Sequence, residues 1–185
     1  MNTYELLPLF QQHAEKQKKY FGVSERNNWA DMPIELRSRF IQKVTSYLIE
    51  ECVELEYEES VDDYDKALLE LADIFIYGMG LAAVSGVNLE KLLANIHTEI
   101  GGMYVPHSID FVRDITEINR TLNHLYKPFK AEKEVDEREL MLRIAKLFCT
   151  WFEYANGVFD NNEALNAVYV KLNYNTTRAD HSVNA

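Results

Sequence analysis

Acidic residues recur at helical spacing in two neighbouring segments of this 185-residue chain. The first segment carries Glu50, Glu51 and Glu54, and the second carries Glu70 and Asp73. Residues three and four apart share one side of an α-helix, so this spacing can bring several carboxylates together. Clustered carboxylate oxygens suit a hard divalent cation such as Mg²⁺. The chemistry that such a cluster could support is a metal-assisted hydrolysis.

The first acidic segment places its carboxylates along an apolar stripe. Leu48 and Leu55 fall within about 60° of Glu51 around a helix with 100° per residue, and so does Glu54. Glu50 is about 100° away, at the edge of the stripe. A solvated acidic face would lie opposite the apolar face. We therefore expect these carboxylates to face the interior of the protein.

The second acidic segment is apolar almost all round, apart from Glu70 and Asp73, which predicts a buried helix. Burying bare carboxylates costs several kcal/mol unless something compensates for their charge. Lys66 is the only cation close in phase, so a bound divalent cation explains the cluster better than ion pairing does. The absence of His nearby argues against zinc and against a di-iron bundle. We predict Mg²⁺, with Mn²⁺ able to substitute.

The two acidic segments read EECVE and ELAD, which have the forms E-E-x-x-E and E-x-x-D. This pair resembles the signature of the all-α nucleotide pyrophosphohydrolases, the superfamily of MazG-type enzymes and dimeric dUTPases. The resemblance covers about residues 33–92. It implies an all-α helical bundle with a four-helix catalytic core. It also implies Mg²⁺-dependent hydrolysis of a nucleoside triphosphate at the α–β bond, which yields a nucleoside monophosphate and pyrophosphate.

The resemblance also implies residue roles. Glu51, Glu54, Glu70 and Asp73 would be metal ligands. Glu50 would be a further ligand or the base that orients the attacking water. The catalytic carboxylates would then be Glu50 and Glu51.

A polar string near the C-terminus is similar to the Lys/Asn/Arg string with which dimeric dUTPases hold phosphate and sugar. It reads Tyr169-x-Lys171-x-Asn173-x-Asn175-x-x-Arg178, and we expect Tyr169, Lys171, Asn175 and Arg178 to bind substrate. The glycine-tyrosine ending usual in those dUTPases is missing, because the chain ends in RADHSVNA. The resemblance therefore predicts the hydrolase class and leaves dUTP, dCTP and purine dNTPs open as substrates.

Seven Gly and four Pro are few for this length and favour helices over sheets. Periodicity predicts seven helices, at about residues 3–20, 33–59, 63–84, 88–100, 108–126, 136–156 and 161–174. We expect a single domain over residues 1–185. Its parts are an N-terminal helix and loop (1–32), the metal-binding helices (33–100), and a second helical half that carries the C-terminal string (101–185).

Composition limits the partners. A net charge of −11 argues against a nucleic-acid-binding module. The first residues lack the pattern of a secretory signal, and no stretch reaches about 18 uncharged apolar residues, so we expect a cytoplasmic protein that does not bind membranes. Cys52 and Cys149 both lie in apolar helical patterns, which predicts buried thiols rather than a disulfide.

Leu68, Leu71, Phe75 and Met79 spread over more than one face of their helix, which predicts a homodimer or a larger homo-oligomer that covers them. Two other classes of function stay open. One is a non-enzymatic helical protein that binds metal or serves as an interaction module, and the other is a pure Ca²⁺ or Mg²⁺ binder. A base pocket could be formed by Gln11, Gln12, Trp29 and Tyr47, but we favour surface amides and core aromatics as the interpretation of these residues.

Overall fold

The structure is a computed structural model that describes residues 1–99, 104–125 and 137–183, except the side chains of residues 123–125 and 176–183. The described residues form helices and no strands, which confirms the all-α class. Two 3₁₀ turns, η1 (Thr3–Leu6) and η2 (Trp29–Asp31), accompany seven α-helices. These are α1 (Leu7–Phe21), α2 (Ile34–Ser60), α3 (Tyr64–Val84), α4 (Leu89–Ala94), α5 (Ser108–Leu125), α6 (Glu137–Val158) and α7 (Asn161–Val183).

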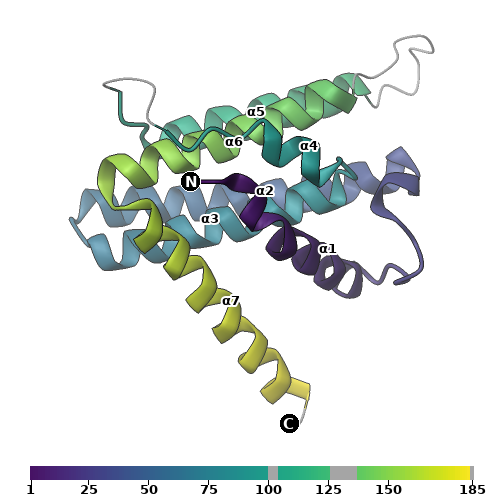
Figure 1. The fold of residues 1–185 in the computed structure, drawn as a ribbon, viewed down its shortest axis with the longest axis horizontal. Coiled ribbons are helices and arrows are strands. Elements are labelled where there is room, and N and C mark those ends of the chain that lie inside the picture. Colours follow the sequence, from purple (N-terminus) through teal and green to yellow (C-terminus); the bar gives the residue numbers. More distant parts are fainter. Residues whose placement is uncertain (100–103, 126–136, 184–185) are drawn as a thin grey trace.

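Helix α3 lies at the centre of the bundle, where it packs against α1, α2, α6 and α7. The pair α2 and α3 runs side by side, and the pair α5 and α6 packs along it in a second layer (Figure 1). Helix α7 crosses the bundle, and its C-terminal part extends away from it (Figure 1). Four long helices, α2, α3, α5 and α6, therefore make the core, and α1 and α7 flank α3.

A short turn joins α2 to α3. Asp62 adopts a positive φ of 55°, and its N–H donates to the Glu59 carbonyl. The Asp63 side chain then caps α3 by accepting a hydrogen bond from the Lys66 N–H at 3.2 Å. Because the turn is this tight, α2 and α3 must run antiparallel as direct neighbours.

Aromatic side chains fill the space between α3 and α6. The Phe75 ring lies 5.1 Å from that of Phe148 and 4.7 Å from that of Trp151, centroid to centroid. The Trp151 indole donates to the Leu71 carbonyl at 2.7 Å, so its polar group is satisfied in the core. Gly78 allows this close packing, because a Cβ there would meet the Phe148 ring at 3.0 Å.

These contacts correct the argument for a partner subunit. Leu71, Phe75 and Met79 are fully buried within the single chain, and Leu68 is partly buried. The rings of Phe148 and Trp151 on α6 cover Phe75, so this side chain needs no second subunit to bury it. Helix α3 is also long and apolar enough to cross a membrane, but 72% of its most apolar window is buried inside the bundle, as in a core helix of a folded protein.

Two helix ends differ from the expected positions. Helix α4 ends at Ala94 instead of near residue 100, because the following backbone binds α6: the His97 N–H donates to Cys149 Sγ, and the Thr98 carbonyl accepts from the Asn156 side chain. Helix α7 continues to Val183 instead of ending near residue 174, and neither Gly nor Pro interrupts it. Cys52 and Cys149 are buried and unpaired, as expected.

Candidate active site

The α2–α3 turn sets the register of the acidic residues. Glu51 and Asp73 both stand eleven residues from Asp62, and Glu54 and Glu70 both stand eight residues from it. In an antiparallel helix pair, residues equally distant from the turn lie beside each other. The structure accordingly brings Glu51, Glu70 and Asp73 together, with one carboxylate oxygen from each lying within 4.8 Å of the others.

Glu50 and Glu54 do not join this cluster, and both are exposed on α2. The buried stripe of this helix, which includes Leu48 and Cys52, is centred about 60° from Glu51, on the side away from Glu54. Glu51 therefore lies at the edge of the stripe, where it is half-buried, and not at its centre. Our expectation that Glu54 faces the interior is therefore wrong, and Glu50, which we placed at the edge of the stripe, is exposed.

The cluster has more negative charge than its surroundings can easily stabilise. Burial raises the pKa of Glu51 to about 8, and the charges of Asp73, Glu54 and Glu70 act in the same direction. Burial also raises the pKa of Glu70 and that of Asp73. The same causes, burial first and then the charges of Glu51 and Asp73, raise the pKa of Tyr77 to about 12.

The nearest cation in the described part of the chain is Lys171, and not Lys66 as the helical phase had suggested. The Lys171 Nζ donates to Asp73 Oδ2 from α7, and its charge lowers the pKa of both Asp73 and Glu70 against the effect of burial. Lys66 lies one helical turn before Glu70, in the first turn of α3, and pairs there with Asp63 at 3.0 Å and with Glu58 at 3.9 Å. One lysine therefore faces three carboxylates, and the cluster keeps an excess of negative charge.

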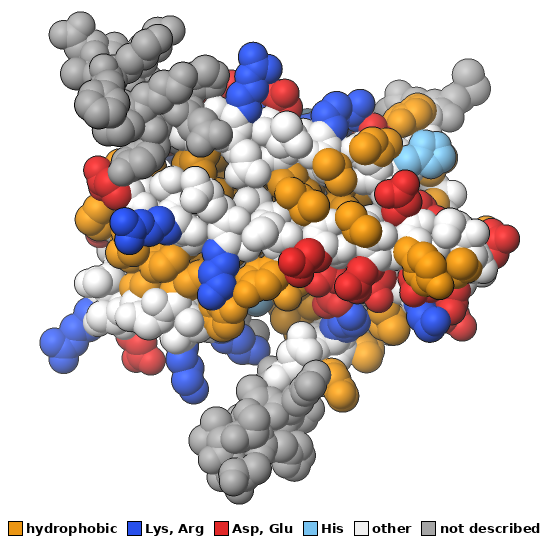
Figure 2. Space-filling model, turned by 180° about the vertical axis from the view of Figure 1, so that it is seen from behind, with side chains coloured by type: hydrophobic (Ala, Val, Ile, Leu, Met, Phe, Trp, Pro, Cys, Tyr) orange, Lys and Arg blue, Asp and Glu red, His pale blue; other side chains and the backbone are white. Residues whose placement is uncertain are grey.

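This donor set fits a divalent cation. The three carboxylates are hard oxygen donors that converge from two rigid helices, and burial raises the pKa of each. His and Cys, which zinc prefers, are absent from the cluster. Glu51, Glu70 and Asp73 could hold Mg²⁺ or Mn²⁺, with the remaining positions filled by water or phosphate oxygens. On the face opposite to that of Figure 1, acidic side chains gather where α7 leaves the bundle (Figure 2).

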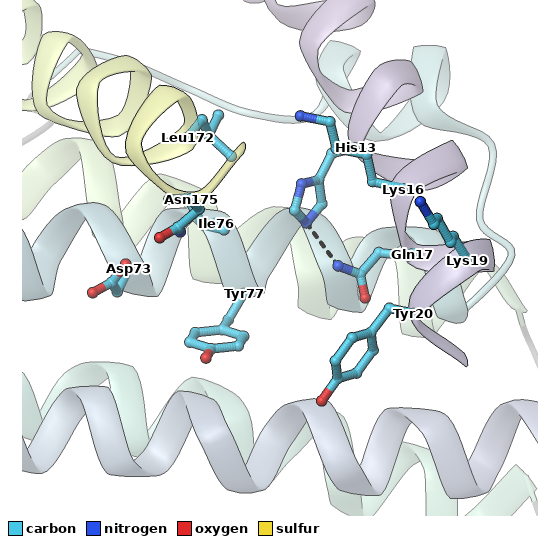
Figure 3. A pocket seen from close by; sticks show the side chains of 10 residues that line it. All are labelled: His13, Lys16, Gln17, Lys19, Tyr20, Asp73, Ile76, Tyr77, Leu172 and Asn175. Atoms are coloured by element: carbon cyan, nitrogen blue, oxygen red, sulfur yellow. Dashed lines mark hydrogen bonds between the residues drawn. The ribbon is translucent and has the colours of Figure 1, made fainter. Parts of the chain in front are cut away.

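A cavity of about 720 Å³ lies beside the cluster, between α1, α3 and α7. Asp73 and Asn175 lie at one side of it, Tyr77 lies next to them, and α1 lines the other side (Figure 3). Pockets for small molecules typically measure about 300–1,000 Å³. The cavity also has the following lining residues: His13, Lys16, Gln17, Lys19, Tyr20, Ile76 and Leu172.

On the α1 side of the cavity, the side chains of His13 and Gln17 are joined by a hydrogen bond. The Gln17 amide nitrogen lies 3.1 Å from His13 Nε2 (Figure 3). With the amide in this orientation, its nitrogen donates to His13 Nε2, which corresponds to the tautomer with the proton on Nδ1. Burial, followed by the charge of Lys16, lowers the pKa of His13 to about 4, so the ring is neutral near pH 7. This leaves the Gln17 carbonyl oxygen as an acceptor in the cavity wall.

The other predicted substrate-binding residues are dispersed. Asn175 lines the cavity, whereas Tyr169 and Gln12 line a smaller one next to it, which shares the lining residues His13, Lys16 and Leu172. Arg178 lies on α7, but its side chain is outside the described residues. Trp29 is buried and donates to the Ala14 carbonyl at 3.0 Å, which is a core contact. The Tyr47 ring stacks on that of Tyr77, with centroids 5.5 Å apart, and Gln11 is exposed.

Sequence reasoning missed the contribution of α1 to the cavity. His13, Gln17 and Tyr20 are spaced by four and three residues, which places them on one helix face. That spacing could have identified a polar face on this helix. The sequence did not indicate that this face would turn toward α3 and the carboxylates.

Comparison with known proteins agrees with this geometry. Residues 20–99 match the sequence model of the family "PRA-PH: Phosphoribosyl-ATP pyrophosphohydrolase". This family is in the MazG-like all-α NTP pyrophosphohydrolase superfamily, so the resemblance inferred from EECVE and ELAD is confirmed. The match supports a pyrophosphohydrolase that acts on a nucleotide, in a family whose enzymes depend on a divalent metal. No curated protein and no solved structure matches the chain.

Proposed function

We propose that this chain, whose residues 20–99 match a family of the MazG-like all-α superfamily, hydrolyses a nucleoside triphosphate or its deoxy form between the α- and β-phosphates. The products are the nucleoside monophosphate and pyrophosphate, the metal is Mg²⁺, and the role is control of the nucleotide pool. The observation that carries this proposal is the position of the carboxylate cluster at the edge of a cavity of about 720 Å³. A nucleoside can occupy that cavity while its phosphates lie against the cluster.

The carboxylates have different roles in this proposal. Glu51, Glu70 and Asp73 would hold the metal, and Glu54 can extend toward it from its exposed position on the same helix as Glu51. Bound there, a divalent cation would supply charge for the phosphates and lower the pKa of a bound water. Glu51 is better placed than Glu50 to orient that water and accept its proton, because Glu50 is exposed and outside the cluster.

The cavity accounts for binding of the nucleoside. Asn175 stands beside Asp73 and is placed to contact the sugar or the α-phosphate (Figure 3). The Gln17 amide, held by neutral His13, offers hydrogen-bonding groups to the edge of a base. Tyr20 and Tyr77 add aromatic surface, on which a base can stack. Lys171 and Arg178 contribute positive charge for the triphosphate.

Phosphoribosyl-ATP is a second candidate substrate, because the matched family is named for it. Its additional phosphoribosyl group requires a contact for a phosphate on the base side of the cavity. Lys16 and Lys19 line that side, opposite Asp73 (Figure 3). A simple nucleoside triphosphate makes no use of these two lysines, so the choice of substrate is open to a direct test.

The test is a panel of canonical and modified dNTPs and NTPs together with phosphoribosyl-ATP, each scored for release of pyrophosphate with Mg²⁺ and with EDTA. We expect metal-dependent turnover of at least one nucleotide. Glu51→Gln should abolish this turnover, whereas Glu56→Gln, an exposed change on another face of α2, should not. Metal-induced stabilisation without any pyrophosphate would instead support a pure metal binder, and no response to metal would support an interaction module.

We also propose that the chain is cytoplasmic and forms a homodimer or a larger homo-oligomer. Ile49, Val53 and Tyr57 on α2, with Val61 directly after it, form an exposed apolar stripe at four-residue spacing, and a second subunit could cover it. Light scattering should then give at least twice the chain mass of 21.6 kDa at micromolar concentration. A species of 21.6 kDa alone would contradict the assembly.

A further inference from the structure

Lys171 reaches the carboxylate cluster from α7, about one hundred residues away in sequence from the acids it faces. Its Nζ donates to Asp73 Oδ2. The two side chains are 23% and 18% exposed, so the ion pair is largely shielded from water. Shielding strengthens the attraction compared with a pair on the open surface. Lys171 therefore supplies the positive charge that this group of acids needs when no metal is bound.

A divalent cation would compete with Lys171 for Asp73. An ion held by Glu51, Glu70 and Asp73 needs an oxygen from each, and these oxygens lie within 4.8 Å of one another. Mg²⁺ binds such oxygens at about 2.0–2.1 Å and requires near-octahedral geometry. An ammonium on the same Asp73 carboxylate would stand close to the ion and be repelled by it.

We propose that Lys171 is a displaceable counter-ion: it holds Asp73 in the metal-free chain, and it leaves Asp73 for the substrate phosphates when the divalent cation binds. This inference rests on the proposed function. Asn175, one helical turn further along α7, lines the cavity beside Asp73, so the displaced ammonium stays at the cavity edge. Lys171 is thus a positioning residue that couples metal binding to substrate binding.

The consequence is a measurable competition. Only molecules in which the Lys171–Asp73 pair is open can bind the metal. The apparent metal affinity of the free protein is therefore lowered in proportion to the fraction of open molecules. Removing the ammonium should therefore tighten metal binding in the absence of substrate, by roughly fivefold for a partly shielded ion pair. Substrate affinity should fall at the same time, because one cation for the phosphates is lost. A lysine that only bound phosphate, or only supported the fold, would leave the metal affinity of the free protein unchanged.

The experiment is calorimetric titration of the substrate-free protein with Mn²⁺. Lys171→Met should bind Mn²⁺ roughly fivefold tighter than the wild type, and Lys171→Arg, which keeps the charge, should stay close to the wild type. Lys66→Met is the matched control, because Lys66 pairs with acids outside the cluster and its loss should leave Mn²⁺ affinity unchanged. Equal or weaker binding by Lys171→Met would overturn the inference while leaving the proposed function intact. Failure of the wild type to bind Mn²⁺ would overturn both.

A second measurement needs no folded Lys171→Met protein. The ¹⁵Nζ signal of Lys171, assigned by its loss in Lys171→Arg, should shift when the wild type is saturated with diamagnetic Mg²⁺, because the ammonium leaves Asp73. The Lys66 signal should stay in place. A Lys171 signal that does not change with saturating Mg²⁺ would overturn the inference.

Discussion

His13 makes the stability of this protein depend on pH in a defined window. The side chain is 7% exposed, and its Nδ1 has no hydrogen-bond partner in the described part of the chain. Burial, followed by the charge of Lys16, lowers the pKa of His13 to about 4, from 6.5 for an exposed histidine. Between these values the unfolded chain binds a proton that the folded chain excludes, so stability is lost as the pH falls from about 6.5 to about 4.

The size of the effect follows from the difference in pKa. Each pKa unit corresponds to about 1.4 kcal/mol, so the full window costs about 3 kcal/mol, and the part between pH 6.5 and 5 costs about 2 kcal/mol. The assay is urea unfolding of the wild type and of His13→Gln at pH 7 and at pH 5. The wild type should lose about 2 kcal/mol more than the variant over this interval, because all other titrating groups are shared. Equal losses in the two proteins would refute the assignment of a buried, neutral His13.

Three further outcomes are expected. In EDTA, Glu51→Gln should melt at a higher temperature than the wild type, because one of the mutually repelling carboxylates is gone. The variant should also lose the rise in melting temperature that Mg²⁺ induces in the wild type. A full Mg²⁺-induced rise in the variant would exclude Glu51 as a metal ligand. Gln17→Leu should lower kcat/KM for the preferred base about tenfold and flatten the discrimination between bases, and unchanged ratios across the panel would remove Gln17 from the base site. Phe75→Ala should destabilise the fold by about 3–5 kcal/mol in urea unfolding, since its ring packs against those of Phe148 and Trp151, and a loss below about 1 kcal/mol would contradict that packing.

The sequence predicted the helices better than the environment of the acids. Periodicity located α2, α3, α5 and α6 to within a few residues, because long apolar stripes without Pro define them. The acid spacing indicated a cluster, and Glu51, Glu70 and Asp73 do converge. Helical phase on α2 alone was misleading for Glu54, since the apolar stripe is broad and its centre is set by the packing against α3 and α5.

Features that depend on distant segments could not be predicted. Lys171 is separated from Asp73 by nearly one hundred residues, and only the path of α7 across the bundle brings them together. The cavity wall formed by His13 and Gln17 depends in the same way on how α1 packs against α3. The expected need for a partner to cover Phe75 failed because α6 covers it within the chain. In each case, tertiary contacts decide what a local pattern leaves open.

The central claim is that water attacks the α-phosphorus of a nucleotide bound between the carboxylate cluster and the cavity. The most direct test is hydrolysis of the preferred nucleotide in ¹⁸O-labelled water with Mg²⁺, followed by mass spectrometry of both products. We expect nucleoside monophosphate and pyrophosphate in equal amounts, with the label in the monophosphate. Label in pyrophosphate would place the attack at the β-phosphorus, and release of a diphosphate with orthophosphate would contradict the proposed reaction.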